Sequence, residues 1–186
     1  MKLQSAPQQK QLQYMRPHLC QWAGDRTDTN AAKREAGRRR AAPHIKTYIR
    51  FADAEKMDSI DWAMVTSANL STQAWGAAPN ASGEVRICSW EIGVVVWPDL
   101  FGSIDAGSKE SVKMVPTFKR DLPVGADIGL PDSDGPGKSP GESPTLIGFR
   151  MPYDLPLTPY SPEDIPWCAT AIHTEPDWIG QTWGGD

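Results

Sequence analysis

The sequence contains few cysteines and no long apolar run. Its cysteines, Cys20, Cys88 and Cys168, lie too far apart in a chain of 186 residues for a disulfide framework or a thiolate zinc site. No apolar run approaches the roughly 20 residues that cross a bilayer, so we expect no membrane partner. Residues 1–14 lack the apolar core of a secretory signal peptide. These absences favour a soluble protein in a reducing, intracellular setting.

Charge is distributed unevenly along a chain whose formal net charge is −4. Residues 31–50 contain seven basic side chains and one acidic side chain, whereas residues 99–186 contain fourteen acids and six bases. A basic segment in an acidic protein attracts an anionic partner, and Arg38, Arg39 and Arg40 form its densest part. A solvated loop or a nuclear-import signal fits this segment about equally well.

The first part of the chain is predicted to be a helix followed by a loop. Apolar side chains recur every three or four residues, which predicts a helix over 4–23 that breaks or ends near Pro17. The apolar face of this helix consists of Leu12, Met15, Leu19 and Trp22. Residues 24–43 are polar, basic and aperiodic, and we interpret them as a surface loop.

Three strands are predicted in the middle of the chain. Residues 44–51 alternate strictly between two faces, and residues 60–66 form a second strand that ends near Thr66. LSTQAWG then predicts a short helical turn closed by Gly76. The β-branched and aromatic run 85–97 predicts a third strand, which Pro98 stops.

The last third of the chain shows little periodicity beyond Phe101. Residues 130–144 are rich in proline, glycine and serine and predict a linker or inserted loop. Residues 151–167 contain too many prolines for a helix, so we expect an extended tail on the surface. Strands mixed with helices predict an α/β domain.

His44 and Lys46 are two residues apart on a predicted strand, which places both side chains on one face about 7 Å apart. Histidine exchanges a proton near neutral pH, and lysine is a fixed cation that binds phosphate oxygens. Together they suit phosphoryl transfer. From this triplet alone, however, two solvated polar residues on a half-exposed strand are the better interpretation.

The string VTSANLS ends the second predicted strand in small polar residues. Asn69 supplies an amide donor, and Ser67 and Ser71 supply hydroxyls beside backbone N–H groups that could bind an anion. Ordinary helix capping uses the same residues and the same geometry, so both interpretations stay open.

Glu91 lies in the hydrophobic run SWEIGVVVW. A carboxylate in such a run is costly to bury without a partner, so Glu91 could orient a histidine or pair with a lysine. A position on the solvent face of an amphipathic strand is the alternative.

Three strings together resemble one enzyme family. PHIKTYIR, WAMVTSANLSTQAWG and SWEIGVVVWP, in this order, are similar to the second catalytic segment of the tyrosyl-DNA phosphodiesterases, a branch of the phospholipase D superfamily. The superfamily motif H-x-K-x4-D has an aspartate where this chain has Phe51, and the branch uses a later asparagine that Asn69 matches. The likeness runs from about Gln4 to the C-terminus and includes the proline-rich tail and Trp183.

This resemblance implies the fold class and the reaction. The fold would be an α/β, phospholipase D-like half, with a mixed β-sheet flanked by helices and a Pro-rich extended tail, as one C-terminal domain over 1–186. The reaction would be hydrolysis of a phosphodiester at a DNA 3′ end, with no metal and no cofactor, in DNA repair in the nucleus. The substrate would be single- or double-stranded DNA whose 3′ end is blocked by a tyrosyl peptide derived from topoisomerase I.

The resemblance also implies a role for each site residue. The family uses two H-K-N sets, and the histidine of the first set forms a covalent phosphohistidine. His44 matches the second histidine, the general acid/base that protonates the leaving phenolate and then activates water. Lys46 and Asn69 match the residues that hold the phosphate oxygens, and Glu91 matches a carboxylate near the site. Ser71 is a weaker match to a DNA backbone contact, and Arg38–Arg40 precede His44 where DNA would approach.

The first H-K-N set is missing from this sequence. The other two histidines, His18 and His173, have no lysine two residues further on. We therefore expect the C-terminal part of an enzyme, inactive without the half that contributes the nucleophilic histidine. A non-catalytic module that binds single-stranded nucleic acid is the alternative. Pairing of two chains through their His44 residues is a third hypothesis, which the missing aspartate disfavours.

Overall fold

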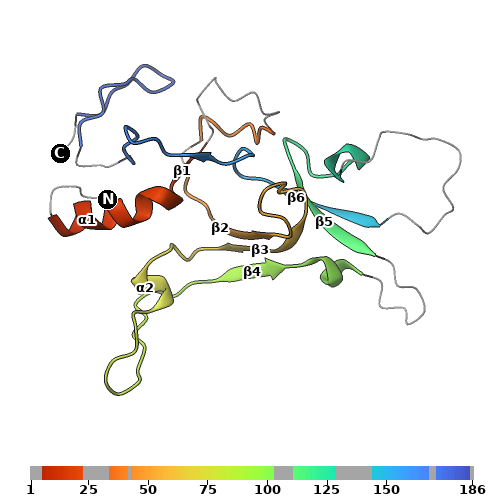
Figure 1. The fold of residues 1–186 in the computed structure, drawn as a ribbon, viewed down its shortest axis with the longest axis horizontal. Helices are drawn as coiled ribbons and strands as arrows, with labels where there is room; N and C mark the ends of the chain where they lie inside the picture. The colour runs from red at the N-terminus through yellow and green to blue at the C-terminus, as the bar shows by residue number, and fades with distance from the viewer. Residues whose placement is uncertain are drawn as a thin grey trace, which may run out of the picture. The chain divides into compact units, whose positions relative to one another are not determined.

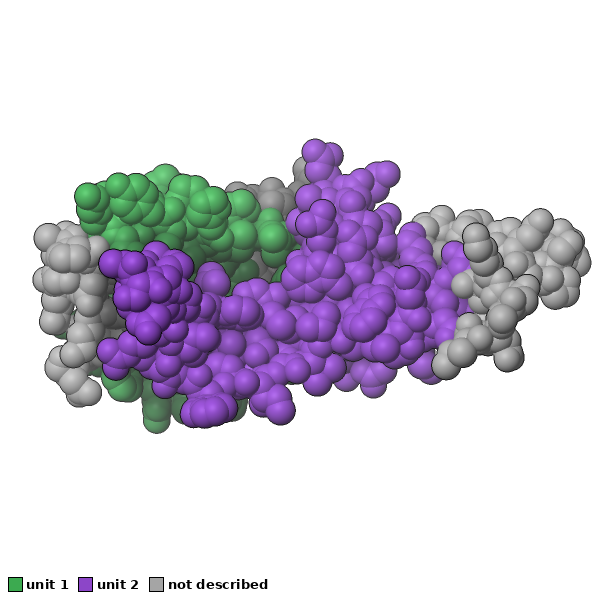
Figure 2. All heavy atoms as spheres, turned by 90° about the horizontal axis from the view of Figure 1, so that it is seen from below, with its two compact units in different colours: residues 1–34, 38–41, 153–186 green, residues 35–37, 42–152 purple. Residues whose placement is uncertain are grey.

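The computed structural model describes residues 6–22, 34–41, 43–102, 111–128, 144–167 and 171–184. Contacts divide the chain into two units, coloured separately in Figure 2. Unit 1 comprises residues 1–34, 38–41 and 153–186, and unit 2 comprises residues 35–37 and 42–152. Within the described ranges, no helix is both long and apolar enough to cross a membrane.

A mixed five-stranded sheet forms the centre of unit 2 (Figure 1). Strand β3 pairs antiparallel with β2, with β4 and, at one position, with β5, whereas β5 and β6 run parallel. The α/β class with a mixed sheet is therefore confirmed. The strands are β2 (Lys46–Phe51), β3 (Ile60–Thr66), β4 (Gly93–Val96), β5 (Val112–Thr117) and β6 (Thr145–Arg150).

Strand β3 forms over the predicted residues, whereas β2 begins at Lys46 and not at the predicted residue 44, so His44 lies just before the strand. On one face, Ile49 and Phe51 pack against a core of Ile60, Ala63 and Met114. Burying these side chains stabilises the sheet by roughly 1.5–3 kcal/mol for each fully buried large apolar residue. The opposite face of β2 is therefore left for the polar residues that alternate with Ile49 and Phe51.

The predicted helical turn is α2 (Thr72–Trp75). Ser71 caps it, because the N–H of Ala74 donates to the Ser71 hydroxyl at 3.3 Å. Gly76 ends it with φ of 86°, in the left-handed region that favours glycine. Local capping residues thus account for both ends of this element.

Strand β4 is shorter than predicted, because only Gly93–Val96 of the run 85–97 pairs with β3. The N–H groups of Cys88 and Ser89 donate instead to the carbonyl oxygen of Gln73 in α2. Residues 85–92 therefore pass beside the helical turn instead of extending the sheet. Pro98 ends the strand as predicted, and the 3-10 helix η2 (Pro98–Phe101) follows.

Strands β5 and β6 have no counterpart among the elements predicted from the sequence. Residues 114–117 of β5 are all buried, so they show no alternation between an apolar and a polar face. Pro116 also disfavours a central strand. It is tolerated here because β5 meets β3 only where Met114 pairs with Ile60. The 3-10 helix η3 (Gly125–Ile128) follows β5, and the predicted linker 130–144 lies outside the described residues except for Pro144.

Unit 1 begins with α1 (Ala6–Met15) and the 3-10 turn η1 (Arg16–His18), so the predicted helix ends near Pro17 as expected. It does not continue to residue 23. Strand β1 (Cys20–Gln21) pairs instead with β7 (Thr158–Pro159). Arg16 fixes this change of direction, since its guanidinium donates to the carbonyl oxygens of Ser161, Pro162 and Asp164.

The basic loop is described over residues 34–41, and the rest of 24–43 lies outside the described residues except for residue 43. Over 34–41 the chain has no helix or strand apart from an isolated bridge between Arg34 and Leu155. The assignment of residues 1–186 to one phospholipase D-like domain stays a prediction.

Candidate functional site

Three chain segments meet at one end of the sheet in unit 2. Lys46, the first residue of β2, pairs with Thr66, the last residue of β3, and Thr66 pairs with Gly93, the first residue of β4. The segments just beyond this row are therefore neighbours. They are His44–Ile45, Ser67–Ser71 and Trp90–Ile92, so the register brings together the parts of the chain that contain His44, Asn69, Ser71 and Glu91.

His44 and Lys46 contact each other at this end of the sheet. The ammonium of Lys46 lies 3.1 Å from Nε2 of His44 and 3.3 Å from the His44 carbonyl oxygen. Lysine has donors only, so Nε2 is the acceptor of this contact in the tautomer that has its proton on Nδ1. The His44 side chain is exposed and precedes the strand, which leaves it accessible to a ligand.

Glu91 is bound to Ser67. The Ser67 hydroxyl donates to Oε2 of Glu91 at 2.5 Å and accepts the N–H of Ile92 at 3.0 Å. The N–H of Ser67 donates in turn to the Ile92 carbonyl oxygen at 2.9 Å. Among the residues that the structure describes, Glu91 forms no hydrogen bond or ion pair with His44 or Lys46, and its side chain is exposed, as the solvent-face alternative predicts.

Asn69 and Ser71 differ in whether their side chains form hydrogen bonds to other described residues. The Asn69 side chain is exposed, and its amide has no hydrogen-bond partner among the described residues. It can therefore bind a ligand without breaking an internal contact. The Ser71 hydroxyl caps α2, and its N–H donates to the Asn69 carbonyl oxygen at 2.8 Å. For Ser71 the capping interpretation is confirmed.

Two residues that shape this site were missed in the sequence. The Thr66 hydroxyl donates to the Ile92 carbonyl oxygen at 2.9 Å and accepts the N–H of Ala68 at 3.1 Å. The Tyr48 hydroxyl donates to the Ala68 carbonyl oxygen at 3.3 Å, and its ring packs edge-on against Trp75. Tyr48 lies two residues after Lys46 and therefore on the same face of β2, so the alternating pattern could have indicated it. No pattern in the sequence indicates the role of Thr66.

The basic residues Arg38, Arg39 and Arg40 belong to unit 1 and are exposed. The guanidinium of Arg40 lies 5.4 Å from the ring centroid of Trp178, a cation–π contact. The Arg38 carbonyl oxygen accepts the indole N–H of Trp22 at 3.0 Å. These contacts hold the backbone of the basic segment at Arg38 and the side chain of Arg40.

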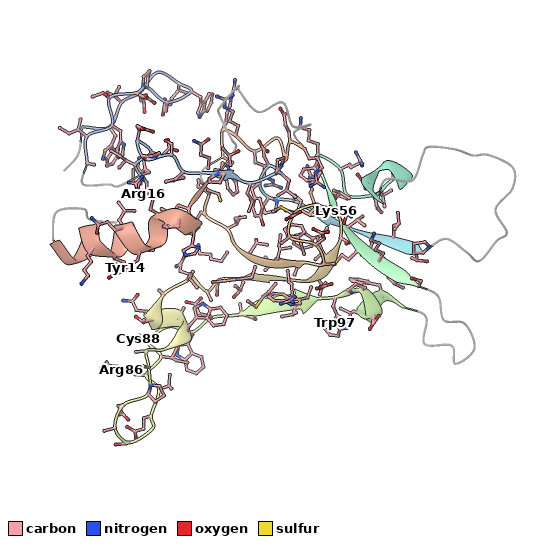
Figure 3. The ribbon with its side chains drawn as sticks, in the orientation of Figure 1. Tyr14, Arg16, Lys56, Arg86, Cys88 and Trp97 are labelled. Atoms are coloured by element: carbon pink, nitrogen blue, oxygen red, sulfur yellow. The ribbon has the colours of Figure 1, made fainter. Side chains whose placement is uncertain are left out.

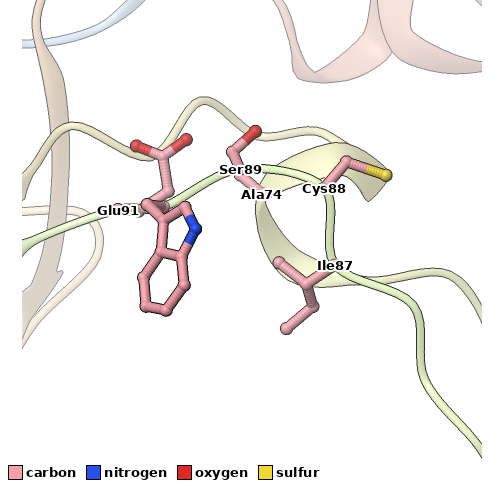
Figure 4. Close-up of a pocket in the computed structure, with 6 residues that line it drawn as sticks. Ala74, Ile87, Cys88, Ser89 and Glu91 are labelled. Atoms are coloured by element: carbon pink, nitrogen blue, oxygen red, sulfur yellow. The ribbon is translucent and has the colours of Figure 1, made fainter.

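A pocket of about 440 Å³ lies beside Glu91 (Figure 4). Its walls come from α2 and from the segment that precedes β4, where Cys88 and Arg86 are labelled in Figure 3. The lining residues are Ala74, Ile87, Cys88, Ser89, Trp90 and Glu91. In the described part of the chain, no group of three or more histidine, cysteine, aspartate or glutamate residues could hold a metal ion.

Comparisons with known proteins agree on one family. The sequence profile described as tyrosyl-DNA phosphodiesterase matches residues 1–161. A Schizosaccharomyces pombe protein named "Probable tyrosyl-DNA phosphodiesterase" is 34% identical over 172 residues, which cover 89% of this chain and 28% of that protein.

Two further relatives are named tyrosyl-DNA phosphodiesterase 1. The Arabidopsis thaliana protein is 30% identical, and the aligned region covers 91% of this chain and 26% of that protein. The Drosophila melanogaster protein is 35% identical, and the aligned region covers 70% of this chain and 17% of that protein. This chain therefore spans less than a third of the curated relatives that it matches. On these matches, the chain belongs to the tyrosyl-DNA phosphodiesterase family.

Proposed function

We propose that this chain is the C-terminal part of a tyrosyl-DNA phosphodiesterase and contributes the acid/base half of its active site. The substrate would be DNA with a 3′-phosphotyrosyl end derived from topoisomerase I, and the setting would be DNA repair in the nucleus. The observation that supports this proposal most strongly is the contact of His44 with Lys46 at the sheet end beside Asn69 and Glu91. Membership of the family supports the reaction class.

In the first step, a histidine from the missing half of the enzyme attacks phosphorus. The bond between phosphorus and the phenolic oxygen breaks, and His44 donates a proton to that oxygen as tyrosine leaves. In the second step, neutral His44 takes a proton from water, and the water oxygen attacks phosphorus and releases the first histidine. A tyrosine hydroxyl has a pKa of about 10 and an unperturbed histidine about 6.5, so a protonated histidine is a competent donor to phenolate.

Lys46 and Asn69 would hold the phosphate in both steps. An incoming phosphate oxygen competes with His44 for the ammonium of Lys46, because an anion is a better acceptor than a neutral ring. When Lys46 turns to the phosphate, Nε2 of His44 becomes free to bear the transferred proton. The exposed amide of Asn69 adds neutral donors, so the charge that spreads over the phosphate oxygens is stabilised with no metal or cofactor.

Glu91 would act through Ser67. Its hydrogen bond to the Ser67 hydroxyl links the segment before β4 to the segment after β3. This link fixes the position of Ser67, where the segment that leads to Asn69 begins. Glu91 is thus proposed to position the phosphate-binding segment, and Ser71 remains a proposed contact to the DNA backbone.

Reconstitution of the enzyme tests this proposal. The chain is assayed on a 3′-phosphotyrosyl oligonucleotide, alone and with the family's missing half added. We expect turnover only in the mixture, and we expect His44→Ala to abolish it. His18→Ala is the matched control, because His18 is also exposed and has no lysine two residues on. Turnover by the chain alone, or full turnover by the His44→Ala mixture, would contradict the half-site assignment.

Binding of single-stranded DNA without catalysis is the second candidate function. The exposed Arg38–Arg40 segment and the contact between Arg40 and Trp178 support it, since arginine and aromatic side chains together bind single strands. This function predicts DNA binding that weakens with salt and is the same in the His44→Ala variant. Loss of activity in the reconstituted His44→Ala enzyme would favour the catalytic function instead.

A further inference from the structure

We infer that Tyr48 and Thr66 are positioning residues for Asn69. Their hydroxyl groups bind the carbonyl and the N–H group of Ala68, the residue directly before Asn69, and so fix where the Asn69 amide stands relative to Lys46. This inference rests on the proposed function, in which Lys46 and Asn69 hold one phosphate. It adds two residues that act on the reaction without touching the substrate.

Ala68 is held by side chains just beyond the end of β3. The Tyr48 hydroxyl donates to the Ala68 carbonyl oxygen at 3.3 Å, and the Ala68 N–H donates to the Thr66 hydroxyl at 3.1 Å. The same Thr66 hydroxyl donates its own proton to the Ile92 carbonyl oxygen at 2.9 Å, which leaves its lone pairs for Ala68. The Ala68 side chain is buried, with a relative exposure of 4%. Two hydroxyl groups therefore take the place of a strand partner for this residue.

Tyr48 connects this segment to the strand that contains Lys46. It lies two residues after Lys46 and therefore on the same face of β2. Its ring packs edge-on against Trp75 of α2, with ring centroids 5.6 Å apart and an angle of 74° between the ring planes. Trp75 thus holds the ring while the hydroxyl reaches Ala68. The spacing between Lys46 and the segment of Asn69 is set by this one planar side chain.

The position of the Asn69 amide depends on this support. Among the described residues, no hydrogen bond fixes the side chain of Asn69 itself, so the backbone on either side decides where the amide stands. That backbone is held at Ala68 and, on the other side, by the N–H of Ser71, which donates to the Asn69 carbonyl oxygen at 2.8 Å. Groups that stabilise developing charge must be held within about 0.5 Å of their working position, and a misplacement of about 1 Å can lower a rate about a hundredfold. Loss of either hydroxyl should therefore lower kcat through Asn69.

Tyr48→Phe tests the inference, because it removes the hydroxyl and keeps the ring on Trp75. In the chain alone, amide hydrogen exchange of Ala68 and Ser71 should become about two- to tenfold faster, as expected for one lost hydrogen bond, while exchange within β3 stays unchanged. In the reconstituted enzyme, kcat on the 3′-phosphotyrosyl oligonucleotide should fall by a similar factor. KM should stay the same, since the donors of Asn69 act mainly on charge that develops in the transition state. Tyr14→Phe, which removes a hydroxyl from an exposed ring in α1, is the matched control and should equal the wild type.

Further variants separate positioning from a loss of stability. Thr66→Val removes the second hydroxyl and should act like Tyr48→Phe, whereas Thr66→Ser keeps the hydroxyl and should retain the wild-type kcat. In an Asn69→Ala background, Tyr48→Phe should cause no further fall in kcat, because the amide to be positioned is already gone. A variant that merely destabilised the fold would lower kcat by the same factor in both backgrounds.

Two results would overturn the inference. One is unchanged exchange at Ala68 and Ser71 in Tyr48→Phe, and the other is an equal fall in kcat with and without the Asn69 amide. Failure of the proposed function would look different, because exchange needs no catalysis. If the reconstituted His44→Ala enzyme kept full turnover, the role of His44 would be wrong, and the exchange rates would still decide whether Tyr48 holds the segment of Asn69.

Discussion

Gly93→Ala probes the close approach of β3 and β4 at the end of the sheet that contains the proposed site. A Cβ at residue 93 would lie 2.8 Å from the Cβ of Thr66 and 2.9 Å from its hydroxyl oxygen. It would also lie 3.1 Å from the carbonyl oxygen of Val65. The Cβ of Thr66 and the carbonyl of Val65 cannot rotate away, so the two strands must move apart.

The expected loss of stability follows from two opposing effects. Forcing an extra methyl group into a packed region costs about 1–3 kcal/mol. Replacing glycine by alanine also stabilises by about 0.4–1 kcal/mol, because the unfolded chain loses conformational freedom. We therefore expect the free energy of unfolding to fall by about 1–2 kcal/mol. The hydrogen bonds between Ser67 and Ile92 should weaken with it, since they lie directly beyond the displaced pair.

Urea unfolding followed by circular dichroism measures this change. The variant should show a lower midpoint with an unchanged slope, which indicates a change in stability alone. Gly184→Ala is the matched control, because a Cβ there meets nothing within 4 Å. If Gly93→Ala were as stable as the wild type, while Gly184→Ala behaved as expected, the inferred close contact of β3 and β4 would be refuted.

Two further predictions concern charge. Replacing Arg38, Arg39 and Arg40 by glutamine should reduce the salt dependence of single-stranded DNA binding, lowering the slope of log K against log salt by about 2, at about 0.7 per charge. Arg86→Gln, an exposed arginine outside the basic segment, should leave that slope unchanged. For Asp53, hydrogen bonds from the N–H groups of Lys56 and Glu55 hold the pKa of the carboxyl below its usual value. The ionised carboxylate of Asp53 therefore stabilises the folded protein above the pKa of about 3.9 that it has in the unfolded chain. This stabilisation is lost as the pH falls through the lower pKa that the carboxyl has in the folded protein. The difference in unfolding free energy between wild type and Asp53→Asn should shrink in acid, and a difference independent of pH would contradict this role.

Prediction from the sequence succeeded where the determinants are local. Alternation placed β2 from Lys46 onward, and the small polar residues after Thr66 marked the end of β3. Ser71 and Gly76 marked the two ends of α2, because each of these signals acts within a few residues. Prediction failed where the environment is decided by distant parts of the chain. The run 85–92 has strand-forming residues and finds no strand partner, whereas β5 pairs in spite of Pro116.

The sequence by itself determined the family, the closeness of His44 and Lys46 at the start of one strand, and the approximate ends of the neighbouring elements. Long motifs in a fixed order are specific, and side-chain direction along a strand repeats every two residues. Only the tertiary structure decided that Lys46, Thr66 and Gly93 form one row, that Glu91 binds Ser67, and that a pocket opens beside them. These contacts join residues about 20 or more positions apart. They depend on strand register and on packing between segments, which no local pattern of residues encodes.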